Sequence, residues 1–388
     1  MPVDWHKVRA EFPSLTFWTF LNTATFGQLP RCGTDAVNRH FQHRDVFACS
    51  DFVDWYSDTD RLRELVGRLI HALPEDIAFI PTTSFALSLL MGGIPWRPGD
   101  RIVTLTDEFP NQIYYPALLA DRGVEFVETP WERFYESITP RTRLVVMSAM
   151  SYITGLRPPV TEIGRFLRER EVLFYLDGTQ GCGALEFDMS EIRPAVFAVH
   201  GYKWMLSPNG AGFMYVNPEV RRWLRPYVVG WRSDQDWRDV DHLRHGAPSF
   251  GQSAEKYEGG MLAHSLLYAM EEAIWMMLEI GPEEIERRVL GLAEQCRQLL
   301  RGLGAEVNTG ERFQSPIISA RLPGCDASAV ALQLKARRVL VSARHGLLRI
   351  STHFYNDEND LDRLHEELKR VIGAPLRALA ALPPTAVT

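Results

Sequence analysis

The 388-residue chain lacks any uninterrupted apolar stretch of membrane-spanning length. The closest candidate, Leu266 to Met277, is interrupted by Glu271 and Glu272. The first residues, MPVDWHKVRAEFP, lack the apolar core of a secretory signal. We therefore expect no membrane association and no export from the cytoplasm.

Paired cysteines and an excess of positive charge are also missing. The formal net charge is -7, the pI is about 5.9, and no concentrated stripe of Lys and Arg appears, which argues against a nucleic-acid surface. The five cysteines form no CxxC pair, so we expect neither a disulfide framework nor a metal site, and a reducing cytoplasm fits them. They are Cys32, Cys49, Cys182, Cys296 and Cys325.

Strand and helix patterns alternate from about Asp76 onward. This alternation predicts an α/β fold with a large domain, in which helices cover both faces of a mainly parallel seven-stranded sheet. Ligands of such sheets collect beyond the carboxyl ends of the strands. The expected strands are Ile77–Ile80, Arg101–Leu105, Val124–Glu128, Leu144–Ser148, Val172–Leu176, Ala195–Val199 and Phe213–Val216, with a helix at Thr161–Arg170 between two of them.

The pattern changes after Pro248. Long helices are expected from about Gly260 to Ile280 and from Pro282 to Leu303. Further strands, helices and the absence of a low-complexity linker predict a smaller C-terminal α/β domain that packs tightly. Its remaining elements are strands at Ile317–Arg321 and Leu347–Ser351 and helices at Asp326–Arg337 and from Asp357. We assign residues 16–250 to the large domain and residues 251–388, with 1–15, to the small one.

A lysine and an aspartate each follow an apolar strand in the run VLFYLDGTQGCGAL…FAVHGYKWMLSPNGAGFMYV. Asp177 ends the first strand, and Lys203 comes shortly after the second. Such a pair suits pyridoxal phosphate (PLP), because the lysine amine can form a Schiff base with the cofactor and the aspartate can keep the pyridine nitrogen protonated. Taken singly, Asp177 could cap a helix and Lys203 could be a solvated cation. Together they predict a PLP site.

Polar residues between the strand at 77–80 and the next helix predict a phosphate site. Backbone N–H groups and hydroxyls of Thr82, Thr83 and Ser84 can bind a phosphate at the start of a helix. Simple N-capping is the alternative. His200 and Tyr202, just before Lys203, can also donate to the phosphate, although His200 could instead be a satisfied buried imidazole.

Two further side chains are suited to the pyridine ring itself. Phe109 follows a strand directly, and its face could stack on the ring, or it could pack in the core. Gln180 lies one turn after Asp177 and could hydrogen-bond the phenolic oxygen of the cofactor.

These motifs resemble the class V aminotransferase family of fold-type I PLP enzymes, which includes cysteine desulfurases, kynureninase-like enzymes and isopenicillin N epimerase-like proteins. The resemblance extends nearly from end to end. It is carried by FLNTATFGQLP (20–30), FIPTTSFAL (79–87), DEFPNQIYYP (107–116), MSYITGLRPPV (150–160), YLDGTQGCGAL (175–185), VHGYKWMLSPNGAGFMYV (199–216) and LLRISTHFYNDENDLDRL (347–364).

The resemblance implies a role for each matching residue and a homodimer with sites at the subunit interface. Lys203 and Asp177 would be catalytic, and Arg349 and Asn22 would bind the substrate, with Arg349 on its carboxylate. Tyr152 would lie near the cofactor. The other implied cofactor contacts are Thr82, Thr83, Phe109, Gln180, His200 and Tyr202.

The implied reaction starts with an external aldimine of an amino acid, from which Lys203 removes the Cα proton. We favour transamination. A C–S lyase-like β-elimination and an epimerisation pass through the same carbanion and stay open. A non-catalytic protein that keeps the fold is the alternative from another class, and the retention of Lys203, Asp177 and Arg349 argues against it.

Two stretches depart from the family pattern. Relatives usually carry a threonine near Met261 that reaches the partner's phosphate, whereas methionine cannot donate a hydrogen bond. The cysteine-bearing loop of desulfurases has no counterpart in Val341 to Leu348. We therefore expect no persulfide-forming desulfurase. The aromatic segment at residues 41–58 could line an apolar substrate channel or pack as a helix at the dimer interface.

Overall fold

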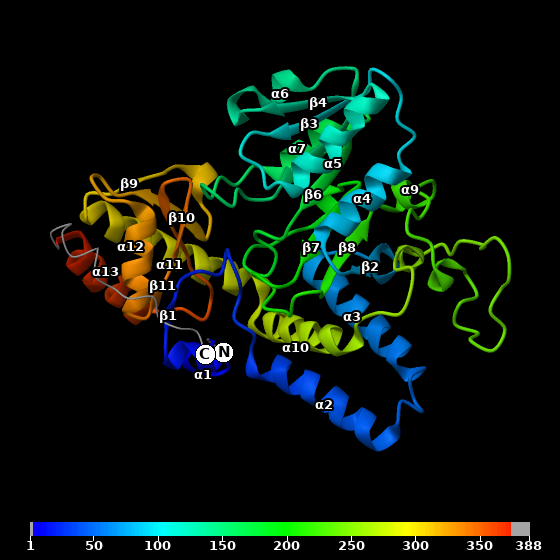
Figure 1. Ribbon diagram of the computed structural model, residues 1–388, viewed down its shortest axis with the longest axis horizontal. Helices are drawn as coiled ribbons and strands as arrows, with labels where there is room; N and C mark the ends of the chain where they lie inside the picture. Colours follow the sequence, from blue (N-terminus) through cyan, green and yellow to red (C-terminus); the bar gives the residue numbers. More distant parts are fainter. Residues whose placement is uncertain (1–2, 374–388) are drawn as a thin grey trace.

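A computed structural model describes residues 3–373 of the chain, so residues 1, 2 and 374–388 of the expected small domain lie outside the described residues. Figure 1 shows a larger α/β unit on one side and a smaller one, which includes the C-terminal helices, on the other. No helix within 3–373 combines the length and the apolar character that crossing a membrane requires.

The larger unit is built on one seven-stranded sheet. One strand, β8, runs opposite to the other six, because it pairs antiparallel with both β2 and β7. The prediction of a mainly parallel seven-stranded sheet is therefore confirmed. The strands, in spatial order, are β2 (Ile77–Ile80), β8 (Gly212–Val216), β7 (Val196–His200), β6 (Leu173–Asp177), β5 (Thr142–Ser148), β3 (Arg101–Leu105) and β4 (Glu125–Thr129).

Helices cover both faces of this sheet because successive strand residues point to opposite sides. Phe79 packs into one core with α3 (Asp54–Ile70), α7 (Val160–Arg168) and α10 (His264–Ile280). Its neighbour Ala78 packs into a second core with α4 (Thr83–Gly93), to which Tyr115 of α5 (Asn111–Leu118) is added. This two-sided burial explains why the strands have nearly continuous apolar sequences.

The smaller unit has an antiparallel four-stranded sheet in the order β12, β13, β10, β9. The strands are Ser342–Arg344, Leu347–Ser351, Ile317–Arg321 and Glu306–Val307. Helices α11 (Pro282–Gly302), α12 (Ala327–Ala336) and α13 (Glu358–Gly373) share its core. The N-terminal segment is fixed here, because β1 (Thr19–Phe20) pairs in parallel with β11 (Val339–Leu340).

Helix α10 differs from its predicted bounds. It begins at His264 rather than Gly260, because Gly259 has a φ of +75° and the next residues are not helical. It packs against α3 and against α2 (Arg31–Phe47). The domain division at residue 250 stays a prediction. The short helices are α1 (Trp5–Ala10), α6 (Phe134–Ser137), α8 (Met189–Ile192) and α9 (Pro218–Arg221).

Candidate active site

One cavity lies where β2, β3, β5, β6 and β7 end, at their carboxyl ends. Every cofactor contact predicted from the sequence lines it, including Lys203 and Asp177. The lining residues are Thr82, Thr83, Ser84, Phe109, Asn111, Gln112, Ser148, Tyr152, Asp177, Thr179, Gln180, His200, Tyr202 and Lys203. Fold topology thus gathers residues that are up to 121 positions apart, from 82 to 203.

Asp177 is buried at the end of β6 and has one donor on each oxygen. The side-chain Nε2 of Gln112 donates to Oδ2 at 2.8 Å. The backbone N–H of Thr179 donates to Oδ1 at 2.9 Å. These two hydrogen bonds fix the orientation of the carboxylate.

Lys203 is buried in the turn after β7. Burial lowers the pKa of its amine to about 8, and the charge of Arg349 adds to this, while Asp177 acts in the opposite direction. Its Nζ lies 5.7 Å from the ring centre of Phe109. A share of the amine is therefore uncharged near neutral pH, as a nucleophile or base requires.

The N-terminal loop lies directly against the backbone of Lys203. The N–H of Gly27 donates to the carbonyl of Tyr202 at 2.8 Å. A Cβ at Gly27 would lie 1.9 Å from the carbonyl oxygen of Lys203, so only glycine fits. The motif at residues 20–30 therefore supports the turn that carries the lysine.

His200 is a neutral hydrogen-bond donor. Its Nε2 accepts the N–H of Gly210 at 3.1 Å, which leaves the proton on Nδ1. Burial, and then the charge of Lys203, lowers its pKa to about 4. The side chain is half-buried, and of the alternative of a buried, satisfied imidazole only the hydrogen bond to Nε2 is present.

The start of α4 combines capping with free helix-end donors. Thr82 is the N-cap, and its hydroxyl accepts the N–H of Phe85 at 3.3 Å, so the capping alternative is correct for this residue. Thr83 is the first helical residue, where backbone N–H groups have no intrahelical partner. An anion in the cavity would meet these groups and the positive end of the helix.

Phe109 and Tyr152 form an aromatic wall at the mouth of the cavity. Their rings meet edge to face, with centres 5.4 Å apart. Phe109 is 47% exposed, so the core-packing alternative is wrong for it. The hydroxyl of Tyr152 lies 3.4 Å from Nε2 of His345.

Arg349 and Asn22 lie beside the cavity rather than in its lining. The Arg349 side chain is 1% exposed and donates to Ser342 Oγ at 3.1 Å, to the carbonyl of Tyr152 at 2.7 Å and to Thr25 Oγ1 at 2.6 Å. Burial lowers its pKa to about 9. Asn22 accepts from the same Thr25 hydroxyl at 2.9 Å. Their roles in substrate binding stay predictions.

Gln180 is held by two groups of the protein. Its Nε2 donates to the carbonyl of Ala24 at 3.0 Å, and its Oε1 accepts from Trp204 Nε1 at 2.7 Å. One N–H of the amide is left for a ligand, so a bond to the cofactor stays possible as predicted.

Five residues at this edge of the sheet were not predicted: Glu108, Asn111, Gln112, Ser148 and Thr179. Both oxygens of Glu108 accept from Ser148, from its N–H at 2.7 Å and its hydroxyl at 2.6 Å. Burial raises the pKa of Glu108 to about 7, and the neighbouring Asp177 adds to the rise. The signal was present, because Glu108 follows a predicted strand just as Asp177 does.

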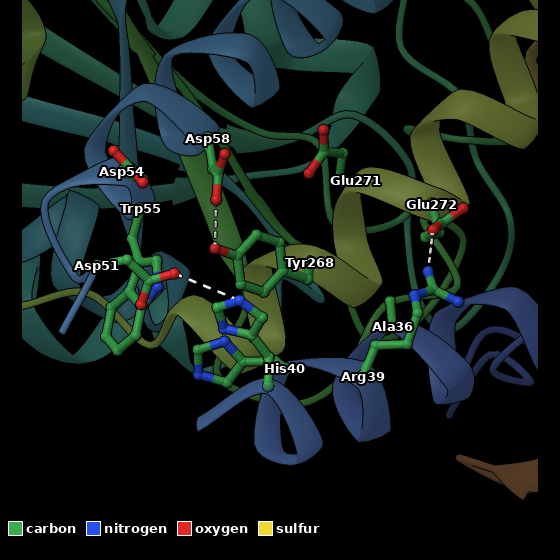
Figure 2. A pocket seen from close by; sticks show the side chains of 11 residues that line it. Ala36, Arg39, His40, Asp51, Asp54, Trp55, Asp58, Tyr268, Glu271 and Glu272 are labelled. Atoms are coloured by element: carbon green, nitrogen blue, oxygen red, sulfur yellow. Dashed lines mark hydrogen bonds and ion pairs between the residues drawn. The ribbon is translucent and has the colours of Figure 1, made fainter. Parts of the chain in front are cut away.

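A second hollow lies between α2, α3 and α10, away from the Lys203 cavity (Figure 2). Two of its acidic residues are paired within the hollow, Glu272 with Arg39 at 2.5 Å and Asp58 with the Tyr268 hydroxyl at 2.5 Å. Trp55 from the aromatic segment at 41–58 lines this hollow, and no residue of that segment lines the Lys203 cavity.

Comparisons with known proteins identify the family of the chain. The family model described as Aminotransferase class-V matches residues 42–364. The chain is 27% identical to the isopenicillin N epimerase of Amycolatopsis lactamdurans, over 95% of this chain and 98% of that protein. It is 25% identical to a probable cysteine desulfurase of Methanothermobacter thermautotrophicus, over 94% and 98%.

Solved structures show the same fold. The cystine C-S lyase C-DES, in complex with its product cysteine persulfide, superposes with a TM-score of 0.84 at 22% identity, over 92% of this chain and 98% of that one. A cysteine desulfurase of Thermococcus onnurineus gives 0.84 at 20% identity, over 96% and 99%. The chain therefore belongs to the class V aminotransferase family, whose members are PLP-dependent and have the fold-type I architecture.

Proposed function

We propose that the protein is a PLP-dependent enzyme that removes the Cα proton of an amino acid, with transamination as its reaction. One observation carries the proposal: a buried amine and a buried carboxylate, Lys203 and Asp177, share one cavity at the carboxyl ends of the strands. Within residues 3–373 no cluster of His, Cys, Asp and Glu could hold a metal ion in its place.

The groups around the cavity fit PLP in charge and in shape. The N-terminus of α4, Thr83 and the neutral His200 offer donors to a phosphate. Asp177 suits a protonated ring nitrogen, the exposed face of Phe109 suits an aromatic ring, and the remaining N–H of Gln180 suits a phenolic oxygen. When bound, PLP supplies an electron sink for the charge that develops at Cα.

Lys203 would bind the cofactor and then move the proton. Its lowered pKa, about 8, lets the amine act first as a nucleophile and then as a base at Cα. Arg349 would orient the substrate, because its three hydrogen bonds to the protein leave two N–H groups of the guanidinium free for a carboxylate. The enclosing strand-end loops would exclude water from the reacting atoms.

Lys203→Ala tests this function. We expect the folded variant to lose covalent PLP attachment and activity, while a Lys369→Ala control at an exposed position keeps both. Borohydride reduction of the wild type followed by mass mapping would locate the cofactor. A phosphopyridoxyl group on another residue would overturn the assignment, and a protein that stays colourless with added PLP would favour the non-catalytic alternative.

The products separate the three reactions that share Cα deprotonation. Transamination passes the amino group of the substrate to an added keto-acid acceptor and releases the keto acid of the substrate without ammonia, β-elimination releases ammonia and a keto acid together with the leaving group, and epimerisation returns the other enantiomer. We expect keto acid without ammonia from a panel of amino acids. Ammonia or the enantiomer as the main product would replace transamination by the corresponding alternative.

We also propose a homodimer in the cytoplasm. The support for the dimer is the family resemblance together with apolar side chains left exposed on α2. The support for the compartment is that all five cysteines are free thiols. Met261 is exposed, so a partner subunit would meet a thioether where relatives carry a threonine.

A further inference from the structure

Gln112 is the only side chain among residues 3–373 that donates to the carboxylate of Asp177. It lies in the first turn of α5 and is 1% exposed. Its backbone N–H donates to the carbonyl of Phe109 at 2.9 Å, so the same turn that presents the aromatic ring also fixes the amide. Gln112 thus links Phe109, which would face the ring of PLP, to Asp177, which would face its nitrogen.

The direction of the Gln112 amide follows from the charge of Asp177. An ionised carboxylate only accepts hydrogen bonds, so the amide must turn its NH₂ group toward Oδ2. This leaves Oε1 of Gln112 buried and, within residues 3–373, without a partner. A buried carbonyl without a partner costs free energy, and the charge-assisted bond on the other side of the amide offsets that cost.

The other groups near Asp177 cannot replace this bond. Thr179 donates through its backbone to the opposite oxygen. Glu108, the neighbouring acid, gives both oxygens to Ser148. Loss of the Gln112 amide would therefore leave Oδ2 with no side-chain donor in a buried site.

We propose that Gln112 is a positioning residue that holds the carboxylate of Asp177 aimed at the ring nitrogen of PLP, and so supports the protonation of the ring. This inference rests on the proposed function, because it concerns the cofactor's nitrogen. Gln112 itself performs no chemical step. Its effect reaches the cofactor only through Asp177.

A binding experiment on the cofactor-free full chain separates this role from a purely structural one. Dissociation constants are measured for PLP and for the carbocyclic analogue in which C–H replaces the ring nitrogen. We expect Gln112→Met to weaken PLP about tenfold, as for a hydrogen bond to a charged group, and to change the analogue less than about twofold. Gln112→Asn, which keeps the amide but shortens its reach, should behave in the same way and serves if the first variant does not fold.

Gln298→Met is the matched control, because Gln298 also donates to a carboxylate, Glu294, but on the exposed surface of a helix. It should leave both dissociation constants unchanged. A second readout is the ¹⁵N chemical shift of the ring nitrogen in labelled PLP, which we expect to report deprotonation at lower pH in the Gln112 variants than in the wild type.

Two outcomes would overturn the inference: equal losses for PLP and the analogue, or no loss for either. Failure of the proposed function looks different, because the wild type itself would then bind neither compound at Lys203.

Discussion

Two buried carboxyl residues, Asp177 and Glu108, lie at the edge of the sheet where the Lys203 cavity is found. Asp177 was recognisable from the sequence because it ends an apolar strand and precedes Lys203 by one strand. Glu108 and Gln112 were not recognised. Their partners, Ser148 and Asp177, belong to β5 and β6, and only the spatial order of β3, β5 and β6 brings them together. Strand order in a parallel sheet does not follow from the order of the strands in the chain.

Glu108 should make the stability of the protein depend on pH. Its pKa is raised from 4.5 to about 7, so the folded state keeps a proton that the unfolded state releases. The stabilisation is complete below about pH 4.5 and is lost as the pH rises toward 7. Over this window the loss is at most about 3 kcal/mol. Glu108→Gln should remove this pH dependence. Urea unfolding of the cofactor-free protein at several pH values between 4.5 and 7 measures the free energy of unfolding of both proteins.

The control for this prediction is Glu132→Gln at a surface position. It should follow the wild-type pH profile. If Glu108→Gln shows the same slope as the wild type, Glu108 does not carry the proton.

Arg349 should govern substrate binding through the substrate's carboxylate. We expect Arg349→Ala to raise the KM for amino acids about tenfold or more, because a charged hydrogen-bonded pair is lost. Arg321→Ala, on the neighbouring strand β10 and exposed, is the control. Arg349 also donates hydrogen bonds to Tyr152 and Thr25, so its loss could disturb the structure. Amines without a carboxylate are therefore tested in parallel. An equal rise in the KM of these amines would show that Arg349 has a structural role only.

Secondary-structure elements with continuous apolar sequence were predicted most closely. The bounds of β2, β3, β10 and β13 match the expected ranges, because both ends of each strand are marked by polar or turn residues. The start of α10 was missed, since the apolar pattern begins before the backbone becomes helical. The helices α2 and α3 were not delimited, because aromatic residues on several faces hide their periodicity.

The connection between β12 and β13 bears on sulfur chemistry. Only His345 and Gly346 separate the hairpin-forming strands, and both have positive φ, 48° and 76°. This two-residue turn contains no cysteine. Cys182 and Cys296 are buried, and burial raises the pKa of both thiols, which makes them poor nucleophiles.

We therefore expect no protein persulfide after incubation with L-cysteine. Alkylation followed by mass mapping of all five cysteines checks this, with serine variants of Cys32, Cys49 and Cys325 included because these three are partly exposed. A persulfide formed at the rate of turnover would make the protein a desulfurase.

At the scale of the whole molecule, the fold class could be predicted because alternation of strands and helices leaves few topologies. The assembly of the subunits could not be predicted in the same way, because the periodicity of apolar residues does not show which surfaces of two copies meet. Exposed apolar side chains give the first physical indication of such contacts. On α2 they are Phe41, Val46 and Phe47.

A dimer through the α2 face predicts a solution mass of about twice the 44.2 kDa of the chain. Phe41 and Val46 are 48% and 76% exposed, so replacing both by glutamate should not disturb the core of the subunit. We expect this double variant to sediment as a monomer, because charges at the centre of an interface oppose association. Leu332→Glu on α12, which removes an apolar side chain that is 63% exposed, is the matched control and should remain dimeric. Sedimentation velocity decides between the outcomes: a monomeric wild type contradicts the dimer, and a dimeric double variant moves the interface away from α2.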